Sequence, residues 1–233
     1  MEKEVSKEVM KDMIRWGMIG CGDVAETKSG PALYNADGST LEIVMSRDKA
    51  ITEDFAKRHG IKHWTLNAHE LIFSKNIDAV YVATPPDSHL YYAKLVAESG
   101  KYLLMEKPLA RNLEEAKELI DCCNETGTTI FVAYYRRALP RFLKVKEWID
   151  SKIIGTPTFI HIQHNGSPEN HPVSPIDSNN VPPLEDLPWR FIPEISGGGN
   201  FVDCGTHMLD MVDFLFGPIT EVEARAYNQA GIY

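Results

Sequence analysis

An aspartate and a histidine, Asp203 and His207, lie four residues apart, shortly after the glycine run 197–199. Residues at this spacing share one face of a helix, where a carboxylate can orient an imidazole and raise its basicity. Such a pair suits a reaction in which a hydroxyl loses its proton as hydride leaves the same carbon. A capping aspartate beside a buried, hydrogen-bonded histidine would show the same spacing. The spacing alone leaves both interpretations open.

Asp210 follows His207 by three residues, so Asp203, His207 and Asp210 also suggest metal ligands. This spacing offers no clear third ligand and matches no standard zinc pattern. We therefore expect no metal at these residues.

Lys107 lies within Glu106-Lys107-Pro108, directly after the apolar run 101–105, which predicts a strand. Ligands of open α/β sheets bind at the carboxyl ends of the strands. This location makes Lys107 a candidate for proton transfer and Glu106 a candidate to line a ligand. The alternative for Lys107 is a solvated charge at the end of a strand.

A second motif follows another predicted strand, 79–83, and reads Thr84-Pro85-Pro86-Asp87-Ser88-His89. His89 would lie in the first turn of the next helix, where it could reach the ligand side of the crevice. Simple helix capping by Asp87 is the alternative explanation of this motif.

The segment 20–25 reads Gly-Cys-Gly-Asp-Val-Ala, a G-x-G-x-x-A motif between a predicted strand, 14–19, and helical spacing over 24–34. Gly20 would permit a tight turn and Gly22 a close approach of pyrophosphate, next to Asp23 and Val24 at a helix N-terminus. The pattern predicts dinucleotide binding by these four residues. A glycine turn of an ordinary α/β fold is the alternative.

Ser46 and Arg47 follow the second predicted strand, 41–45, where NAD-binding versions of this motif carry an acidic residue. A guanidinium there can bind the 2′-phosphate of NADP through paired hydrogen bonds. The sequence therefore favours NADP over NAD. Alternatively, Arg47 is an exposed residue next to a capping Asp48.

Strand and helix patterns alternate along the first half of the chain. The predicted strands are 14–19, 41–45, 63–65, 79–83, 101–105 and 128–133, and the predicted helices are 24–34, 48–59, 68–73, 88–98 and 113–125. This alternation predicts an α/β fold, a doubly wound parallel sheet, over residues 12–137.

The pattern changes after residue 137, so we expect a second domain over 138–233. Helices are predicted at 142–149 and 204–216 and strands at 158–163 and 219–227, with a long Pro-, Asn- and Ser-rich loop between 165 and 193.

The composition excludes several classes of protein. A net charge of -9 without a basic stripe disfavours a nucleic-acid partner. The charged start 1–12 has no apolar core, and no segment resembles a membrane span, so we expect a cytoplasmic protein. The four cysteines show no zinc-like pairs, so we expect reduced thiols.

Taken in order, the motifs at Gly20, His89, Glu106 and Asp203 resemble those of the Gfo/Idh/MocA oxidoreductase family, from about Ile14 to Tyr233. Trp189-Arg190 and the segment 135–137 (Tyr-Arg-Arg) also resemble the family pattern.

The resemblance implies a Rossmann domain followed by an α+β domain whose open, mainly antiparallel sheet covers the nicotinamide and often joins subunits into a homo-oligomer. It implies a catalytic trio of Lys107, Asp203 and His207 and hydride transfer at a carbinol or carbonyl carbon of a sugar, cyclitol or related polyol. It also implies a set of cofactor-lining residues, namely Thr84, Pro85, Pro86, His89, Glu106, Lys107, Arg136, Trp189 and Arg190.

Family members are longer, and their second sheet needs strands beyond Tyr233, so we expect a partial second domain here. Two alternatives to a dehydrogenase remain: a glycosidase of the same fold that keeps its nicotinamide bound, and a non-catalytic dinucleotide-binding sensor. The intact trio argues against the sensor, and the shortened second domain argues for it.

Overall fold

The computed structural model of the chain describes residues 13–163, 188–199 and 201–227. The chain divides into two compact units. Unit 1 contains the chain up to Thr84, together with Ser88–Glu106 and Leu113–Val132. Unit 2 contains Pro85–Asp87, Lys107–Asn112 and the chain from Ala133 onward. The charged start 1–12 and most of the expected loop 165–193 lie outside the described residues.

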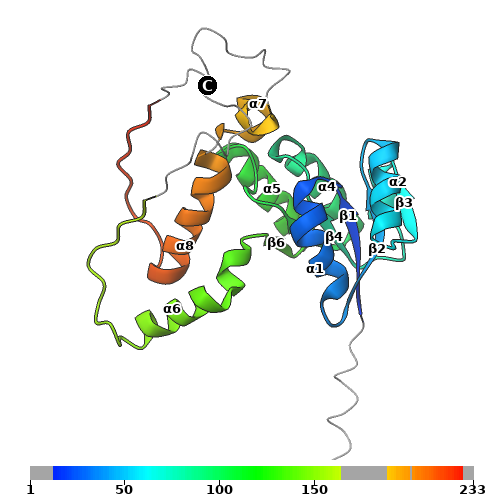
Figure 1. The fold of residues 1–233 in the computed structure, drawn as a ribbon. Coiled ribbons are helices and arrows are strands. Elements are labelled where there is room, and N and C mark those ends of the chain that lie inside the picture. Colours follow the sequence, from blue (N-terminus) through cyan, green and yellow to red (C-terminus); the bar gives the residue numbers. More distant parts are fainter. Residues whose placement is uncertain (1–12, 164–187, 200, 228–233) are drawn as a thin grey trace, which may run out of the picture. The chain divides into compact units, whose positions relative to one another are not determined.

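Unit 1 is built on a six-stranded sheet in which every neighbouring pair is parallel (Figure 1). The strand order is β3-β2-β1-β4-β5-β6. The strands are β1 (Ile14–Ile19), β2 (Ser39–Met45), β3 (His63–Thr65), β4 (Ala79–Val82), β5 (Tyr102–Met105) and β6 (Ile130–Val132). This order is that of a Rossmann fold, so the predicted doubly wound sheet is confirmed.

Helices cover both faces of this sheet, because its central strands are apolar on both sides. The helices of unit 1 are α1 (Gly30–Asn35), α2 (Lys49–Arg58), α3 (Ala68–Ile72), α4 (His89–Ser99) and α5 (Leu113–Thr126). On one face, Met18 and Val44 join a core cluster that includes Leu33 of α1 and Phe55 of α2. On the other face, Gly17 lies against Leu71 of α3.

The helix predicted after the glycine motif is divided in two. Residues Ala25–Ser29 form a π-helical turn, η1, in which the Gly30 N–H donates to the Ala25 carbonyl, and α1 follows. Pro31, in the first turn of α1, has no N–H to continue the regular pattern, and Gly30 has no Cβ to collide with the Ala25 carbonyl. The predicted helical segment 24–34 is therefore confirmed as helical, but its residues 25–29 form a π-helical turn in place of regular α-helix.

The order of β1 and β4 decides where a ligand can enter. The chain leaves β1 toward β2 on one side and returns to β4 on the other, so the loops after β1 and β4 diverge. Open α/β sheets bind ligands in the crevice at this switch point, outside the carboxyl ends of the strands. Gly20 follows β1, and Thr84 comes shortly after β4.

Unit 2 is helical in its described part. It contains the short turns η3 (Tyr135–Ala138), η6 (Trp189–Phe191) and η7 (Phe201–Gly205), a π-helical turn, and the helices α6 (Pro140–Asp150), α7 (Pro193–Ser196) and α8 (Thr206–Phe216). A further short turn, η2 (Pro86–Ser88), spans both units. The predicted helix 204–216 is confirmed from Thr206 onward.

The two segments predicted as strands in the second domain, 158–163 and 219–227, form neither strand nor helix in this structure. A segment of alternating apolar and polar residues forms a strand only if a neighbouring strand pairs with it through hydrogen bonds. The described residues of unit 2 supply no such strand. These two predictions were wrong for the described chain.

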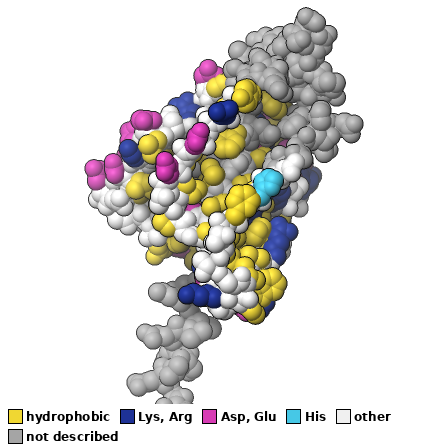
Figure 2. Space-filling model, turned by 90° about the vertical axis from the view of Figure 1, so that its left-hand side faces the viewer, with side chains coloured by type: hydrophobic (Ala, Val, Ile, Leu, Met, Phe, Trp, Pro, Cys, Tyr) yellow, Lys and Arg dark blue, Asp and Glu magenta, His cyan; other side chains and the backbone are white. Residues whose placement is uncertain are grey.

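Large apolar side chains of both segments are consequently exposed, among them Phe159 and Val222. Figure 2 shows hydrophobic side chains interspersed with charged side chains of both signs on the face in view. Among the described helices, none combines the length and the apolar character needed to cross a membrane.

Candidate functional site

The glycine motif closes tightly at its first residue. Gly20 has φ +105°, and its N–H donates to the Met45 carbonyl oxygen at 2.8 Å. A Cβ at Gly20 would lie 2.7 Å from the Ala83 carbonyl oxygen. A side chain at this position would meet both an unfavourable φ and the neighbouring backbone, so the turn requires glycine.

Gly22 has the opposite surroundings, because a Cβ built there meets no atom within 4 Å. The loop therefore offers bare backbone beside open space, which fits the close approach of a pyrophosphate. Asp23 and Val24 lie at the start of the following turn, where the Thr27 hydroxyl donates to the Asp23 carbonyl oxygen at 2.9 Å and the Ser29 hydroxyl lies 3.0 Å from the Val24 carbonyl oxygen.

Cys21 lies inside the same loop, in an environment that keeps its thiol unreactive. Its thiol lies 3.9 Å from the Met45 carbonyl oxygen. Burial, with a smaller contribution from the charge of Glu26, raises the pKa of Cys21 to about 12. The thiol therefore stays protonated and is a poor nucleophile.

Ser46 and Arg47, at the carboxyl end of β2, have different surroundings: Ser46 is hydrogen-bonded within the protein, and Arg47 is exposed. The Ser46 hydroxyl lies 2.5 Å from Thr52 Oγ1 and donates to the Asp48 carbonyl oxygen at 3.1 Å, at the start of α2. Asp48 caps α2 by accepting from the Ile51 N–H at 3.0 Å. The Arg47 side chain is exposed, so it is accessible to a ligand at this strand end.

His89, the first residue of α4, is fully buried and holds the backbone of the turn that follows β4. Its Nε2 lies 2.9 Å from the Thr84 carbonyl oxygen, and the Ser88 hydroxyl donates to Thr84 Oγ1 at 2.7 Å. Pro85 and Pro86 belong to unit 2. His89 therefore shapes the turn at Thr84.

Glu106, directly after β5, has a partner that the sequence analysis missed. The Glu106 N–H donates to the Val82 carbonyl oxygen at 3.0 Å, and Glu106 Oε1 lies 2.6 Å from the phenol oxygen of Tyr81. The feature of the sequence that could have indicated this contact was a single hydroxyl, that of Tyr81, within the buried strand Ala-Val-Tyr-Val.

In unit 2, Lys107, Asp203 and Arg190 form one charged cluster. Lys107 Nζ donates to Asp203 Oδ1 at 2.5 Å and to the Asp203 carbonyl oxygen at 2.9 Å. Arg190 Nε donates to the other carboxylate oxygen, Oδ2, at 3.1 Å. The Arg190 guanidinium also lies over the ring of Trp189, 4.5 Å from its centroid. One carboxylate thus orients two cations.

Asp203 remains ionised in this cluster. Burial alone would raise the pKa of Asp203, whose side chain is only 17% exposed. The hydrogen bond and the charge of Lys107, joined by those of Arg190, outweigh burial and hold this pKa below the ordinary value. The pairing of Arg190 with Asp203 was not predicted from the sequence.

Tight backbone packing brings this part of the chain together. Gly197 has φ +83°, and a Cβ there would lie 2.6 Å from the Arg111 Cα. Arg111 Nη1 donates to the Glu194 carbonyl oxygen at 2.5 Å. The glycine run therefore lets the segment that carries Asp203 pass close to the segment that begins with Lys107.

His207 lies in the first turn of α8 and is buried. The rings of Tyr134 and Tyr135 meet its imidazole edge-on, with centroids 5.9 and 5.5 Å away. Asp203 lies in the π-helical turn η7 and His207 lies in α8, so the two residues do not belong to one regular α-helix as the spacing assumed. The direct action of Asp203 on His207 stays a prediction.

Arginines of the same segment hold α8. Arg136 Nη1 lies 3.6 Å from Met208 Sδ. Arg137 binds Asp210 and Asp213, with Nη2 2.6 Å from Asp210 Oδ1 and 3.1 Å from Asp213 Oδ2. The segment 134–137 therefore contacts α8 along two turns and holds His207 between its rings.

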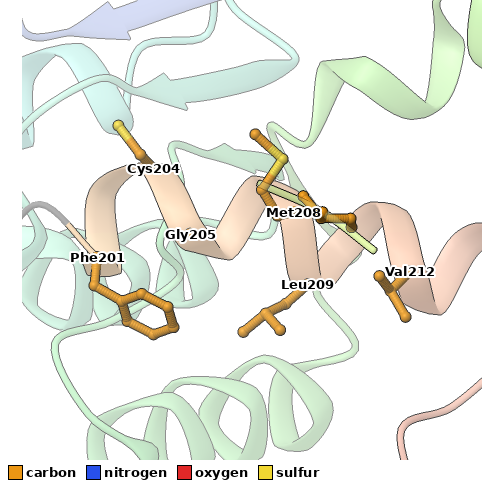
Figure 3. Close-up of a pocket in the computed structure, with 7 residues that line it drawn as sticks. Phe201, Cys204, Gly205, Met208, Leu209 and Val212 are labelled. Carbon is orange, nitrogen blue, oxygen red and sulfur yellow. The ribbon is translucent and has the colours of Figure 1, made fainter. Parts of the chain in front are cut away.

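A separate apolar hollow of about 420 Å³ lies along η7 and α8 (Figure 3). Its lining is Ile162, Phe201, Cys204, Gly205, Met208, Leu209 and Val212. Asp203 and His207 are not among these residues, so the hollow differs from the charged cluster. Within the described ranges, no group of three or more His, Cys, Asp or Glu side chains could hold a metal ion.

Two family models match the chain. One is described as an oxidoreductase family with an NAD-binding Rossmann fold and matches residues 14–134. The other is described as the GFO/IDH/MocA C-terminal domain and matches residues 142–231.

Named relatives agree with these models. Oxidoreductase P35 of Formosa agariphila is 42% identical, with 92% of this chain and 64% of that protein covered. The D-xylose 1-dehydrogenase [NADP(+)] of Haloarcula marismortui is 30% identical, with coverages of 87% and 54%. The scyllo-inositol 2-dehydrogenase (NAD(+)) of Bacillus subtilis is also 30% identical, with coverages of 89% and 55%.

A solved structure, a putative NADPH-dependent oxidoreductase from Desulfitobacterium hafniense, is 25% identical with a TM-score of 0.73. The match covers 90% of this chain and 56% of that protein. The chain thus spans less than two thirds of the length of each of these proteins. The family models confirm the resemblance inferred from the motifs, and the chain belongs to the GFO/IDH/MocA family of oxidoreductases, with an NAD-binding Rossmann fold over 14–134.

Proposed function

We propose that this chain is an NAD(P)-dependent oxidoreductase that exchanges hydride with a carbinol or carbonyl carbon of a sugar, cyclitol or related polyol. Residues 12–137 would form the dinucleotide-binding domain and residues 138–233 part of a substrate domain that also joins subunits into a homo-oligomer. The names of the sugar and inositol dehydrogenase relatives support this substrate class.

The contact between Lys107 and Asp203 carries this proposal. An ammonium held at 2.5 Å by an ionised carboxylate is a fixed proton donor and cation, rather than a mobile surface charge. Arg190 on the other carboxylate oxygen fixes the carboxylate itself. A preorganised cation of this kind stabilises negative charge that develops on a substrate oxygen as its proton leaves.

The bound nicotinamide would supply the acceptor or donor of hydride. In the oxidising direction the hydroxyl proton of the substrate passes to a neutral His207, or to Lys107 once the lysine has given up its own proton and is a neutral amine, and in the reducing direction the protonated group returns it. Asp203 orients Lys107 by direct contact. The two tyrosine rings around His207 limit its rotation and leave a buried imidazole, the group most often used for such transfers.

The glycine loop would hold the dinucleotide through bare backbone. Gly20, Gly22, Asp23 and Val24 would surround the pyrophosphate, and Ser46 and Arg47 would meet the adenosine ribose. The exposed Arg47 favours NADP, because its guanidinium can bind a 2′-phosphate. Thr84, Pro85, Pro86, His89, Glu106, Arg136, Trp189 and Arg190 would line or shape the rest of the cofactor site.

A panel of substrates tests the proposal. The intact chain is incubated with D-xylose, scyllo-inositol and further sugars and polyols, with NADP and then with NAD, and reduced nicotinamide is followed by absorbance. We expect reduction with at least one substrate, faster with NADP. Tight dinucleotide binding without turnover on any member of the panel would refute the dehydrogenase assignment.

A further inference from the structure

Tyr81 places a phenol in the most buried strand of the sheet. It lies in β4 and is completely buried, as is its neighbour Val80. An apolar side chain would fill this position without a polar atom to satisfy, because burying an unpaired hydroxyl costs free energy. The partners of the Tyr81 hydroxyl therefore indicate what this polar group contributes.

The hydroxyl has two partners on different elements. The Tyr81 oxygen lies 2.6 Å from Glu106 Oε1 and 2.8 Å from Ser29 Oγ. A phenol carries one proton, and the carboxylate is the stronger acceptor, so the proton is donated to Glu106. Burial, reinforced by the charge of Glu106, raises the pKa of Tyr81 well above its ordinary value, so the phenol remains a donor.

The two partners flank the predicted cofactor edge of unit 1. Glu106 follows β5 directly and is anchored by its N–H to the Val82 carbonyl oxygen. Ser29 ends the π-helical turn that follows the glycine loop, and its hydroxyl lies 3.0 Å from the Val24 carbonyl oxygen. Tyr81 thus connects the turn after the glycine loop to a carboxylate at the end of β5.

We propose that Tyr81 is a positioning residue for dinucleotide binding, which holds the Glu106 carboxylate in the orientation needed to accept a hydrogen bond from the cofactor. This inference rests on the proposed role of Glu106 in lining the cofactor. A carboxylate accepts at both of its oxygens, so Glu106 can bind the phenol and a ribose hydroxyl or amide N–H together. The phenol prevents the carboxylate from turning away into solvent.

The test is a double-mutant cycle in which the affinity for NADPH is measured by nicotinamide fluorescence. Tyr81→Phe, Glu106→Ala and the double variant are compared with the unaltered chain. We expect Tyr81→Phe to raise the Kd for NADPH about fivefold, and Glu106→Ala to raise it about tenfold. The double variant should match Glu106→Ala, because two residues that act through one contact are not additive.

Tyr34→Phe is the matched control. Tyr34 packs against the same core cluster, and its phenol oxygen lies 2.9 Å from His59 Nδ1. Its removal should lower stability to a similar extent as Tyr81→Phe and leave the Kd unchanged. Equal effects of the two tyrosine variants on the Kd would overturn the inference, as would an additive cycle, since Tyr81 would then act on the fold alone.

Other outcomes separate this inference from the proposed function. If Glu106→Ala leaves the Kd unchanged, the positioning role fails while dinucleotide binding stands. If the unaltered chain does not bind NADPH, the proposed function fails as well. Should Tyr81→Phe not fold, Glu106→Gln provides the second variant, because its amide oxygen still accepts from Tyr81. Its Kd should lie clearly below that of Glu106→Ala, and equal Kd values would contradict the positioning role.

Discussion

Arg137 and Asp210 form a salt bridge in which one partner is buried and the other half-exposed. Their closest atoms are 2.6 Å apart, and the side chains are 43% and 5% exposed, respectively. The bridge joins η3 to α8, the helix that carries His207. A carboxylate this deeply buried depends on its cation, since an unpaired buried charge is strongly unfavourable.

Arg137→Met should therefore lower the free energy of unfolding by about 2–3 kcal/mol, because it leaves Asp210 without its cation. Asp213→Asn removes the second, 47% exposed, partner of Arg137 and should cost less than about 1 kcal/mol. Urea unfolding of the two variants measures both values. Equal losses would mean that the bridge to Asp210 behaves as a surface pair.

The two glycines of the loop should separate stability from binding. Gly20→Ala forces a Cβ onto the Ala83 carbonyl at a positive φ and should lower stability by about 1–3 kcal/mol. Gly22→Ala meets no protein atom, so stability should change little, while the new methyl group blocks the pyrophosphate. Thermal unfolding and NADPH titration check the two outcomes. Unchanged NADPH affinity in Gly22→Ala would contradict the proposed pyrophosphate position.

Arg47→Ala should weaken NADP binding about tenfold or more and leave NAD binding nearly unchanged, because only NADP carries a 2′-phosphate. Arg47 is exposed, so no effect on stability is expected. Parallel titrations with the two dinucleotides measure the ratio. An equal loss for both would disprove the preference.

Lys107→Met should reduce kcat by a factor of about 100 or more, while the Kd for NADPH stays nearly constant. The reason is that the variant removes the cation that Asp203 orients and leaves the glycine loop intact. Lys101→Met is the matched control. It makes the same substitution at the residue that directly precedes β5, and it should retain turnover. Retained turnover in Lys107→Met would show that this lysine takes no part in the chemistry and that its ion pair with Asp203 is structural.

Asp203 should make stability depend on pH in the acid range. Its pKa is lowered in the folded chain, so its ion pairs contribute fully above the ordinary aspartate pKa of about 3.9 and are lost as pH falls through the lowered value. The difference in unfolding free energy between the unaltered chain and Asp203→Asn should thus shrink below about pH 4. A difference that stays constant from neutral pH to pH 3 would contradict this assignment.

Local patterns in the sequence were sufficient for unit 1. Each of its six strands was predicted within a few residues, because apolar runs bounded by glycine and proline report burial and turns directly. The G-x-G-x-x-A motif was recognisable for the same reason, since the backbone conformation at Gly20 depends on that residue and its immediate neighbours. The π-helical turn was missed because it depends on Gly30 and Pro31 together.

The partners of the charged side chains were decided by the tertiary structure. Lys107 and Asp203 are 96 residues apart, and the periodicity of either segment carries no information about the other. The same holds for Arg137 with Asp210 and for Tyr81 with Glu106, which meet only after packing. The segments 158–163 and 219–227 show the converse case: they were predicted as strands and form none, because an alternating pattern cannot provide the neighbouring strand that its hydrogen bonds require. The sequence by itself thus determined the strands of unit 1 and the glycine loop after the first of them, whose causes are local. Only the tertiary structure decided which ionised groups meet, because burial and long-range contacts choose the partners.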